Sequence, residues 1–138
     1  MSDKPTPRRR DQTRHERLKA WQAAQSLVVA TYRASGAWPG HERFGLVSQA
    51  RRAAVSISAN VAEGAGRRTG RDFRRFLDIA LGSLAELHVY IVLAKELQYM
   101  DKGAAGALEA LRDHTGRLIW GLCLALDRSI REVRKLGS

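Results

Sequence analysis

Arginines crowd a short segment in the middle of the chain, directly after a glycine-rich stretch. Five of the nine positions from 67 to 75 are cationic: Arg67, Arg68, Arg71, Arg74 and Arg75. Backbone N–H groups at a helix start attract anions, and the arginine guanidinium matches the geometry of phosphate. The segment therefore predicts contact with a phosphate backbone. A helix C-cap followed by an N-cap is the alternative explanation for its glycines.

Nucleotide hydrolysis is not indicated for this segment. It lacks the Lys-Ser or Lys-Thr ending of a phosphate-binding loop, and no strand pattern precedes it. The expected contact is with the phosphates of a nucleic acid.

Charge across the whole chain favours the same ligand. Lys and Arg total 24 against 14 Asp and Glu, a net charge of +10, and 19 of the 24 cations are arginine. Lysine alone would make the chain soluble, so the excess of arginine favours a nucleic-acid ligand. A genome rich in G and C would also increase the number of arginines. Further candidates for contact are Arg51 and, in a basic N-terminal arm over residues 1–16, Arg8, Arg9 and Arg10. The arm is otherwise interpreted as a solvated tail.

A polar stripe is predicted between two helices. Side chains at spacings of three and four place Gln49, Arg52, Ser56, Asn60 and Glu63 on one helix face, and Ser83 and Glu86 are the expected partners on the next helix. We interpret these seven residues as a structural hydrogen-bond network that fixes helix register or subunit contacts. The alternative is a polar ligand site, or an all-α enzyme that uses Arg52, Asn60 and Glu63.

No other residues form a recognisable catalytic or metal-binding pattern. The four histidines are scattered without ligand spacing, and the single cysteine, Cys123, lies in an apolar helical stretch. We expect a non-enzymatic protein without cofactor or metal. One cysteine and the lack of an export signal favour a cytoplasmic location.

Four amphipathic segments separated by glycine and proline must position these side chains. The segments run from about 17 to 34, from 41 to 64, from a Thr69 cap to 98, and from an Asp101 cap to 133. Short connections between them predict an all-α antiparallel four-helix bundle over residues 17–136. Apolar residues fall in amphipathic patterns and not in runs of membrane-spanning length, so no membrane partner is expected.

The third helix carries a second apolar stripe beside its core stripe. This second stripe contains Phe76, Ile79, Tyr90, Leu93 and Leu97. A lone bundle buries one face of a helix, so a second apolar face favours self-association over a monomer with a broad core.

Residues 38–57, together with Ala59–Gly64, carry a longer motif, Trp-Pro-Gly-His-Glu-Arg-Phe-Gly-Leu-Val-Ser-Gln-Ala-Arg-Arg-Ala-Ala-Val-Ser-Ile and Ala-Asn-Val-Ala-Glu-Gly. With Phe73, Phe76 and the Gly82-Ser83-Leu84 run, this motif resembles the four-helix-bundle proteins known as 23S ribosomal RNA intervening-sequence proteins. The likeness is close over residues 18–100. One departure is Ser58, where the family commonly has proline.

The resemblance implies a ring-like homopentamer, similar to the accessory variability determinant that assists the reverse transcriptases of diversity-generating retroelements. It therefore adds a second hypothesis, an adaptor for a protein partner such as a reverse transcriptase. Binding of nucleic acid by an oligomeric bundle is the leading hypothesis, because charge and the second stripe support it independently of the resemblance.

Overall fold

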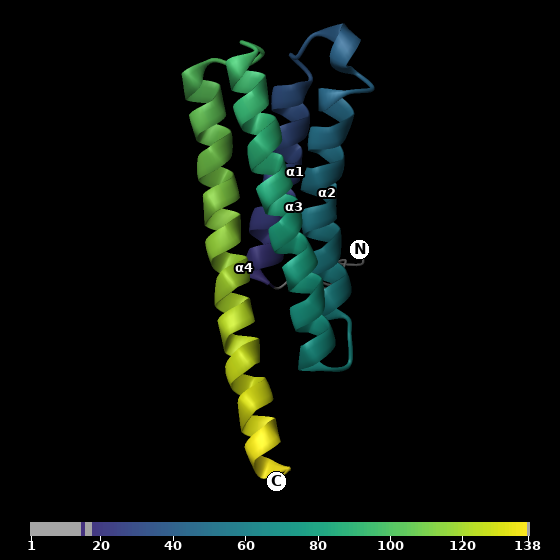
Figure 1. Ribbon diagram of the computed structural model, residues 1–138, viewed down its shortest axis with the longest axis vertical. Helices are drawn as coiled ribbons and strands as arrows, with labels where there is room; N and C mark the ends of the chain where they lie inside the picture. The colour runs from purple at the N-terminus through teal and green to yellow at the C-terminus, as the bar shows by residue number, and fades with distance from the viewer. Residues whose placement is uncertain (1–14, 16–17, 138) are drawn as a thin grey trace, which may run out of the picture.

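The computed structural model describes residue 15 and residues 18–137, and these residues form a bundle of long helices (Figure 1). The N-terminal arm predicted over 1–16, including Arg8, Arg9 and Arg10, lies outside them except for His15. The elements in chain order are α1 (Lys19–Ser35), the short 3-10 helix η3 (Gly40–Glu42), α2 (Leu46–Ala65), α3 (Gly70–Glu96) and α4 (Lys102–Leu136).

The four long helices alternate in direction and share one apolar core (Figure 1). Each helix contributes fully buried side chains to it: Leu27 from α1, Ile57 from α2, Leu77 and Leu87 from α3, and Ile119 from α4. Within a helix the buried residues recur at spacings of three and four, as Ala20, Ala24, Leu27 and Thr31 do in α1, and so form a stripe on one face. The described residues contain no strand, so the predicted all-α four-helix architecture is confirmed.

Both predicted N-caps are present. The Thr69 hydroxyl accepts a hydrogen bond from the backbone N–H of Asp72 at 3.2 Å, and the Asp101 carboxylate accepts one from Ala104 at 2.7 Å. Each satisfies a backbone donor that the first helical turn leaves free. These caps fix where α3 and α4 begin.

The predicted start of the second helix near residue 41 is wrong. Residues 40–42 form η3, and α2 begins only at Leu46. The Glu42 carboxylate accepts a hydrogen bond from the Tyr99 hydroxyl at 3.1 Å, and burial followed by this bond raises the pKa of Tyr99. A partner 57 residues away therefore holds the turn in place.

α3 ends in a Schellman motif at the same end of the bundle. The Tyr99 N–H donates to the Ala94 carbonyl at 2.8 Å, and the Gln98 N–H donates to Lys95 at 3.0 Å. Gln98 has a φ of 63°, the left-handed conformation that this position requires. Trp38 and Met100 are buried beneath these turns. We call this the loop-closed end.

The opposite end is closed less completely. There α4 continues past the start of α3 (Figure 1), and residues 128–136 form what we call the α4 extension. Gly70 lies against this helix: a Cβ placed on it would lie 3.6 Å from Leu126 and 3.8 Å from Ile130. Further along, Val133 and Leu136 are exposed.

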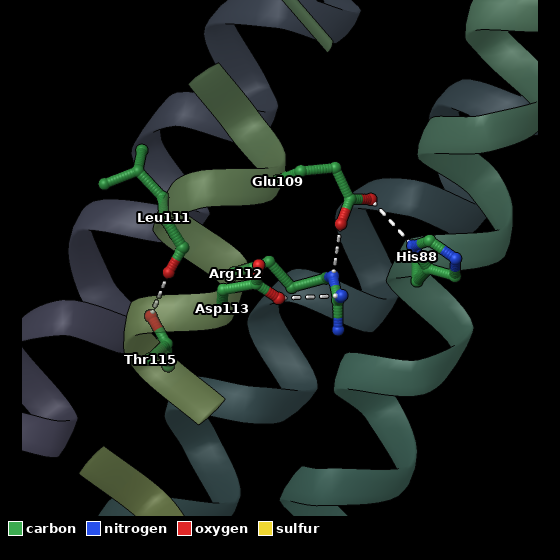
Figure 2. Close-up of polar contacts among 6 residues, drawn as sticks. All are labelled: His88, Glu109, Leu111, Arg112, Asp113 and Thr115. Carbon is green, nitrogen blue, oxygen red and sulfur yellow. Dashed lines mark hydrogen bonds and ion pairs between the residues drawn. The ribbon is translucent and has the colours of Figure 1, made fainter. Parts of the chain in front are cut away.

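About two turns into α4, an ion cluster joins this helix to α3 (Figure 2). Glu109 accepts hydrogen bonds from His88 Nδ1 and from Arg112 Nε, both at 2.9 Å, and Arg112 also reaches Asp113 at 3.1 Å. His88 is half exposed, so this cluster supports helix register at the surface.

α3 alone among the described helices is long and apolar enough to span a membrane by length and composition. Helices at the core of soluble bundles pass the same test, and α3 buries Leu77, Ala80, Leu84, Leu87 and Ile91 between its neighbours. We attribute its hydropathy to that packing.

Candidate nucleic-acid interface

The arginine segment lies at the end of the bundle away from the loop-closed end, in the turn between α2 and α3. Arg67, Arg68, Arg71 and Arg75 are all exposed. Together with the α4 extension, this turn forms what we call the arginine end. The extension adds four more cations, Arg128, Arg131, Arg134 and Lys135, against one anion, Glu132.

Two of these exposed arginines, Arg67 and Arg75, contact neighbouring carboxylate and aromatic side chains. Arg67 pairs with Glu63 at 2.6 Å, and its guanidinium lies 4.7 Å from the centre of the Phe76 ring. Arg75 lies 5.4 Å from the same ring and 3.9 Å from Asp72. Stacking on an aromatic ring leaves the edge of a guanidinium free to donate hydrogen bonds.

Arg68 and Arg71 differ from this pair, because neither makes an ion pair with any residue that the structure describes. Both are exposed and flank the first turn of α3. Their charge is therefore uncompensated locally, which makes them the strongest candidates for phosphate contact.

Arg74 does not belong with the phosphate-binding candidates. Its guanidinium pairs with Asp78 on the same helix and, at 3.0 Å, with Asp127 of α4. Burial lowers the pKa of Arg74, but the two carboxylates more than offset this and leave it raised. Arg74 is a structural cation joining α3 to α4, which its position in a run of arginines did not reveal.

Arg51 also makes hydrogen bonds within the bundle. Its Nε donates to the Ser35 hydroxyl at 2.9 Å and its Nη2 to the Tyr32 carbonyl at 3.2 Å. The guanidinium lies 4.5 Å from the centre of the Tyr32 ring. Arg51 thus caps the C-terminus of α1 from α2, and the prediction that it contacts nucleic acid conflicts with this geometry.

The predicted polar stripe contains a smaller hydrogen-bond cluster. Ser56 and Ser83 share a hydrogen bond at 2.8 Å between α2 and α3, and the Asn60 amide donates to the Ser56 carbonyl at 2.8 Å and to its hydroxyl at 3.1 Å. Ser83 is the partner that the spacing predicted. This cluster fixes the register of α2 against α3.

The other four members of the stripe lie outside that cluster. Gln49, Arg52 and Glu86 are exposed, and Glu63 pairs with Arg67. The side chains suggested for an enzyme site therefore do not converge. Asn60 donates a hydrogen bond to Ser56, Glu63 pairs with Arg67, and Arg52 is exposed.

The second apolar stripe of α3 divides into buried and exposed parts. Phe76 is buried, Tyr90 is half-buried, and Ile79, Leu93 and Leu97 are exposed. Of the exposed members, Ile79 borders the serine cluster, since it lies one turn from Ser83 on α3. Phe76 belongs to the bundle because Gly64 lets α2 approach it: a Cβ on Gly64 would lie 2.9 Å from the Phe76 Cβ.

A cleft at the arginine end escaped the sequence-based prediction. It has a volume of about 290 Å³ and lies between the first turn of α3 and the α4 extension. Arg71 and Arg134 lie at its sides, and Ile130 and Val133 line it. The core stripe of α4 continues through Leu126, Ile130 and Val133, and this spacing is the sequence signal from which the cleft could have been predicted.

Within the described residues, no three His, Cys, Asp or Glu side chains lie close enough to hold a metal. Cys123 is fully buried, and burial raises the pKa of its thiol, an effect that Arg74 partly counters. A neutral buried thiol is a poor nucleophile.

Comparison with known proteins identifies the family. The sequence profile of the 23S rRNA-intervening sequence proteins matches residues 16–121. A crystal structure from Bacteroides thetaiotaomicron, of a protein of unknown function from the S23 ribosomal protein family, is similar with a TM-score of 0.70 and 18% identity, covering 75% of this chain and 97% of that one. No curated protein matches. At that identity the likeness shows the fold, and the profile match shows that the chain belongs to the 23S rRNA-intervening sequence protein family.

Proposed function

We propose that this protein binds the phosphate backbone of nucleic acid through its arginine end. The observation that carries the proposal is the pair Arg68 and Arg71, two exposed guanidinium groups beside a helix start with no anionic partner among the described residues. Because backbone phosphates are the same in every sequence, binding is expected to discriminate weakly between sequences.

The surroundings of this pair favour a polyanion over a small anion. Arg67 and Arg75 stack on Phe76 on the same surface, and the α4 extension adds cations beside the turn. A surface with many cations gains affinity by releasing counterions from a long charged ligand. A single phosphate would occupy only a small part of it.

The test is a fluorescence-anisotropy titration of RNA and DNA at several salt concentrations with an Arg68→Gln/Arg71→Gln variant. Each arginine that contacts phosphate should contribute about 0.7–0.9 to the slope of log K against log salt, so the variant should lower both affinity and slope. The matched control is Arg33→Gln/Arg117→Gln, which removes the same charge at exposed positions elsewhere.

Two outcomes would reject the proposal. Wild-type protein that binds no nucleic acid near 50 mM salt lacks the activity, since phosphate contacts are strong there. Equal losses in the control and the test variant would mean that net charge alone, without a particular site, causes the binding. Binding that requires a protein partner would favour the adaptor hypothesis.

Self-association is the second part of the proposal, and the exposed Ile79, Leu93 and Leu97 support it. These three side chains give α3 an apolar surface that a second subunit would cover. Light scattering on Leu93→Gln/Leu97→Gln beside wild type tests this, with a smaller mass expected for the variant. The family resemblance implies a pentamer, which a stable dimer or a wild-type monomer would exclude.

A further inference from the structure

The cleft between α3 and the α4 extension combines two features that a phosphate contact alone does not need. Arg71 and Arg134 line it, and neither makes an ion pair within the described part of the chain. The aliphatic side chains of Ile130 and Val133 line it as well. The cleft therefore offers charge and apolar surface to one ligand.

The apolar part of the cleft is open to solvent. Val133 is 67% exposed although it continues the stripe that packs the core of α4 higher up. The helices α1 and α2 do not line this part of the cleft. An exposed valine beside Ile130 is a surface that a ligand with a flat apolar face can cover.

Its size limits what that ligand can be. At about 290 Å³, the cleft is at the lower limit of small-molecule sites. A docked protein helix would extend over several turns, whereas one nucleotide supplies an anionic phosphate and an apolar base within a comparable volume. The charges of Arg71 and Arg134 favour an anionic occupant over an uncharged apolar one.

We propose that this cleft binds one unpaired nucleotide of a single-stranded nucleic acid, with a phosphate between Arg71 and Arg134 and the base against Ile130 and Val133. The proposal rests on the function proposed above and adds a preference for single strands. A duplex keeps its bases stacked and paired inside, so it can offer the arginines phosphate but cannot offer the cleft a base.

The residues that line the cleft lie partly inside and partly outside the family match. Arg71 lies inside the matched residues 16–121, whereas Ile130, Val133 and Arg134 lie beyond them. The proposed base contact with Ile130 and Val133 therefore uses residues beyond the family match, and substitutions there leave Arg71 in place.

The experiment compares three RNA ligands at one salt concentration: a single strand of about 20 nucleotides, the same backbone with abasic sites, and a blunt-ended duplex of the same length, which has no unpaired nucleotides. Wild-type protein should bind the single strand about 3- to 10-fold more tightly than the abasic strand, an effect smaller than that of aromatic stacking because no aromatic side chain lines the cleft.

Val133→Ser is the diagnostic variant, and Leu136→Ser is its control. Leu136 is 89% exposed on the same extension but does not line the cleft. Val133→Ser should remove the preference for the single strand and leave affinity for the abasic strand and the duplex unchanged. Leu136→Ser should bind all three ligands as wild type does, and thermal unfolding should show both variants folded.

Equal wild-type affinity for the single and abasic strands overturns this inference while leaving the proposed function intact. A preference that survives Val133→Ser also overturns it, and places the base contact elsewhere. Loss of the preference in both serine variants would mean that the extension acts through its overall hydropathy and not through the cleft. Failure of the function itself is a separate result, because then no ligand of the three binds.

Discussion

The two ends of this bundle are built differently. At the loop-closed end, Trp38 and Met100 are buried, and the Tyr99 hydroxyl bonds to Glu42 across the chain. At the arginine end, Arg68 and Arg71 lack anionic partners among the described residues, and Val133 is exposed. Groups that satisfy one another stabilise the fold, whereas unsatisfied charge and apolar surface are available to a ligand. We therefore expect stability to depend on the first end and binding on the second.

The largest expected effect is at the loop-closed end. Trp38 is 5% exposed, so Trp38→Ala should lower the free energy of unfolding by about 3–5 kcal/mol. Chemical denaturation measures this, and nucleic-acid affinity below the unfolding transition should stay unchanged. Trp38→Phe is the matched control: it keeps a ring and removes an indole N–H that has no hydrogen-bond partner in the described structure, so it should cost less. A large loss of affinity in Trp38→Ala would break the comparison.

Close packing between α2 and α3 ends near Gly64, next to the arginine end. A Cβ at this position would lie 2.9 Å from atoms of both Phe73 and Phe76, so Gly64→Ala should cost about 1–3 kcal/mol of stability. Gly66→Ala is the control, because a Cβ there has no atom closer than 3.6 Å. Denaturant unfolding of both variants would show whether the boundary lies between residues 64 and 66. Equal losses would place it further along the chain.

Substitution of Gln98, also at the loop-closed end, is expected to raise stability, by less than Trp38→Ala lowers it. Its φ of 63° costs a residue with a side chain more than it costs glycine. Gln98→Gly should therefore raise the free energy of unfolding by about 0.5–1 kcal/mol, measured by thermal or chemical unfolding. Glu96→Gly, inside the helical region, should lower stability instead. A loss in Gln98→Gly would show that this side chain makes contacts that matter more than backbone strain.

The smallest effect on stability is expected from the α4 extension. Ending the chain after Asp127 keeps the pair between Asp127 and Arg74 and removes mostly exposed residues, so unfolding should change by about 1 kcal/mol or less. Affinity for single-stranded RNA should fall clearly in the same variant. If the melting temperature dropped as far as in Trp38→Ala, the extension would belong to the core and the contrast between the two ends would fail.

Helix positions followed from local sequence more reliably than the roles of single side chains did. Thr69 and Asp101 cap helices because their hydroxyl or carboxylate reaches a donor three residues away, which is visible in the sequence. The second helix was predicted to start near residue 41, but residues 40–42 form a 3-10 turn in which the Glu42 carboxylate bonds to Tyr99. No local pattern contains a contact of that range.

The same limit explains why two of the candidate arginines proved to be engaged within the bundle. Arg74 and Arg51 stand in basic runs, yet their partners are Asp127 on α4 and the end of α1. Spacing did identify Ser83 as the partner of Ser56, because two facing helices with matched stripes bring their small polar residues together. The cleft required knowing how far α4 passes the start of α3, and that depends on the relative lengths of helices and loops.

Arg51 also bears on the order in which the chain folds. The Tyr32 carbonyl in the last turn of α1 accepts hydrogen bonds from the Gly36 N–H and from Arg51 of α2, and the Ser35 hydroxyl accepts another from Arg51. Because α2 supplies two of these bonds, we expect the end of α1 to be most stable when α2 has docked, so that the two helices open as one cooperative hairpin. Hydrogen exchange should show the amides at the end of α1 opening together with the first turns of α2, at one common rate, and Arg51→Ala should uncouple them.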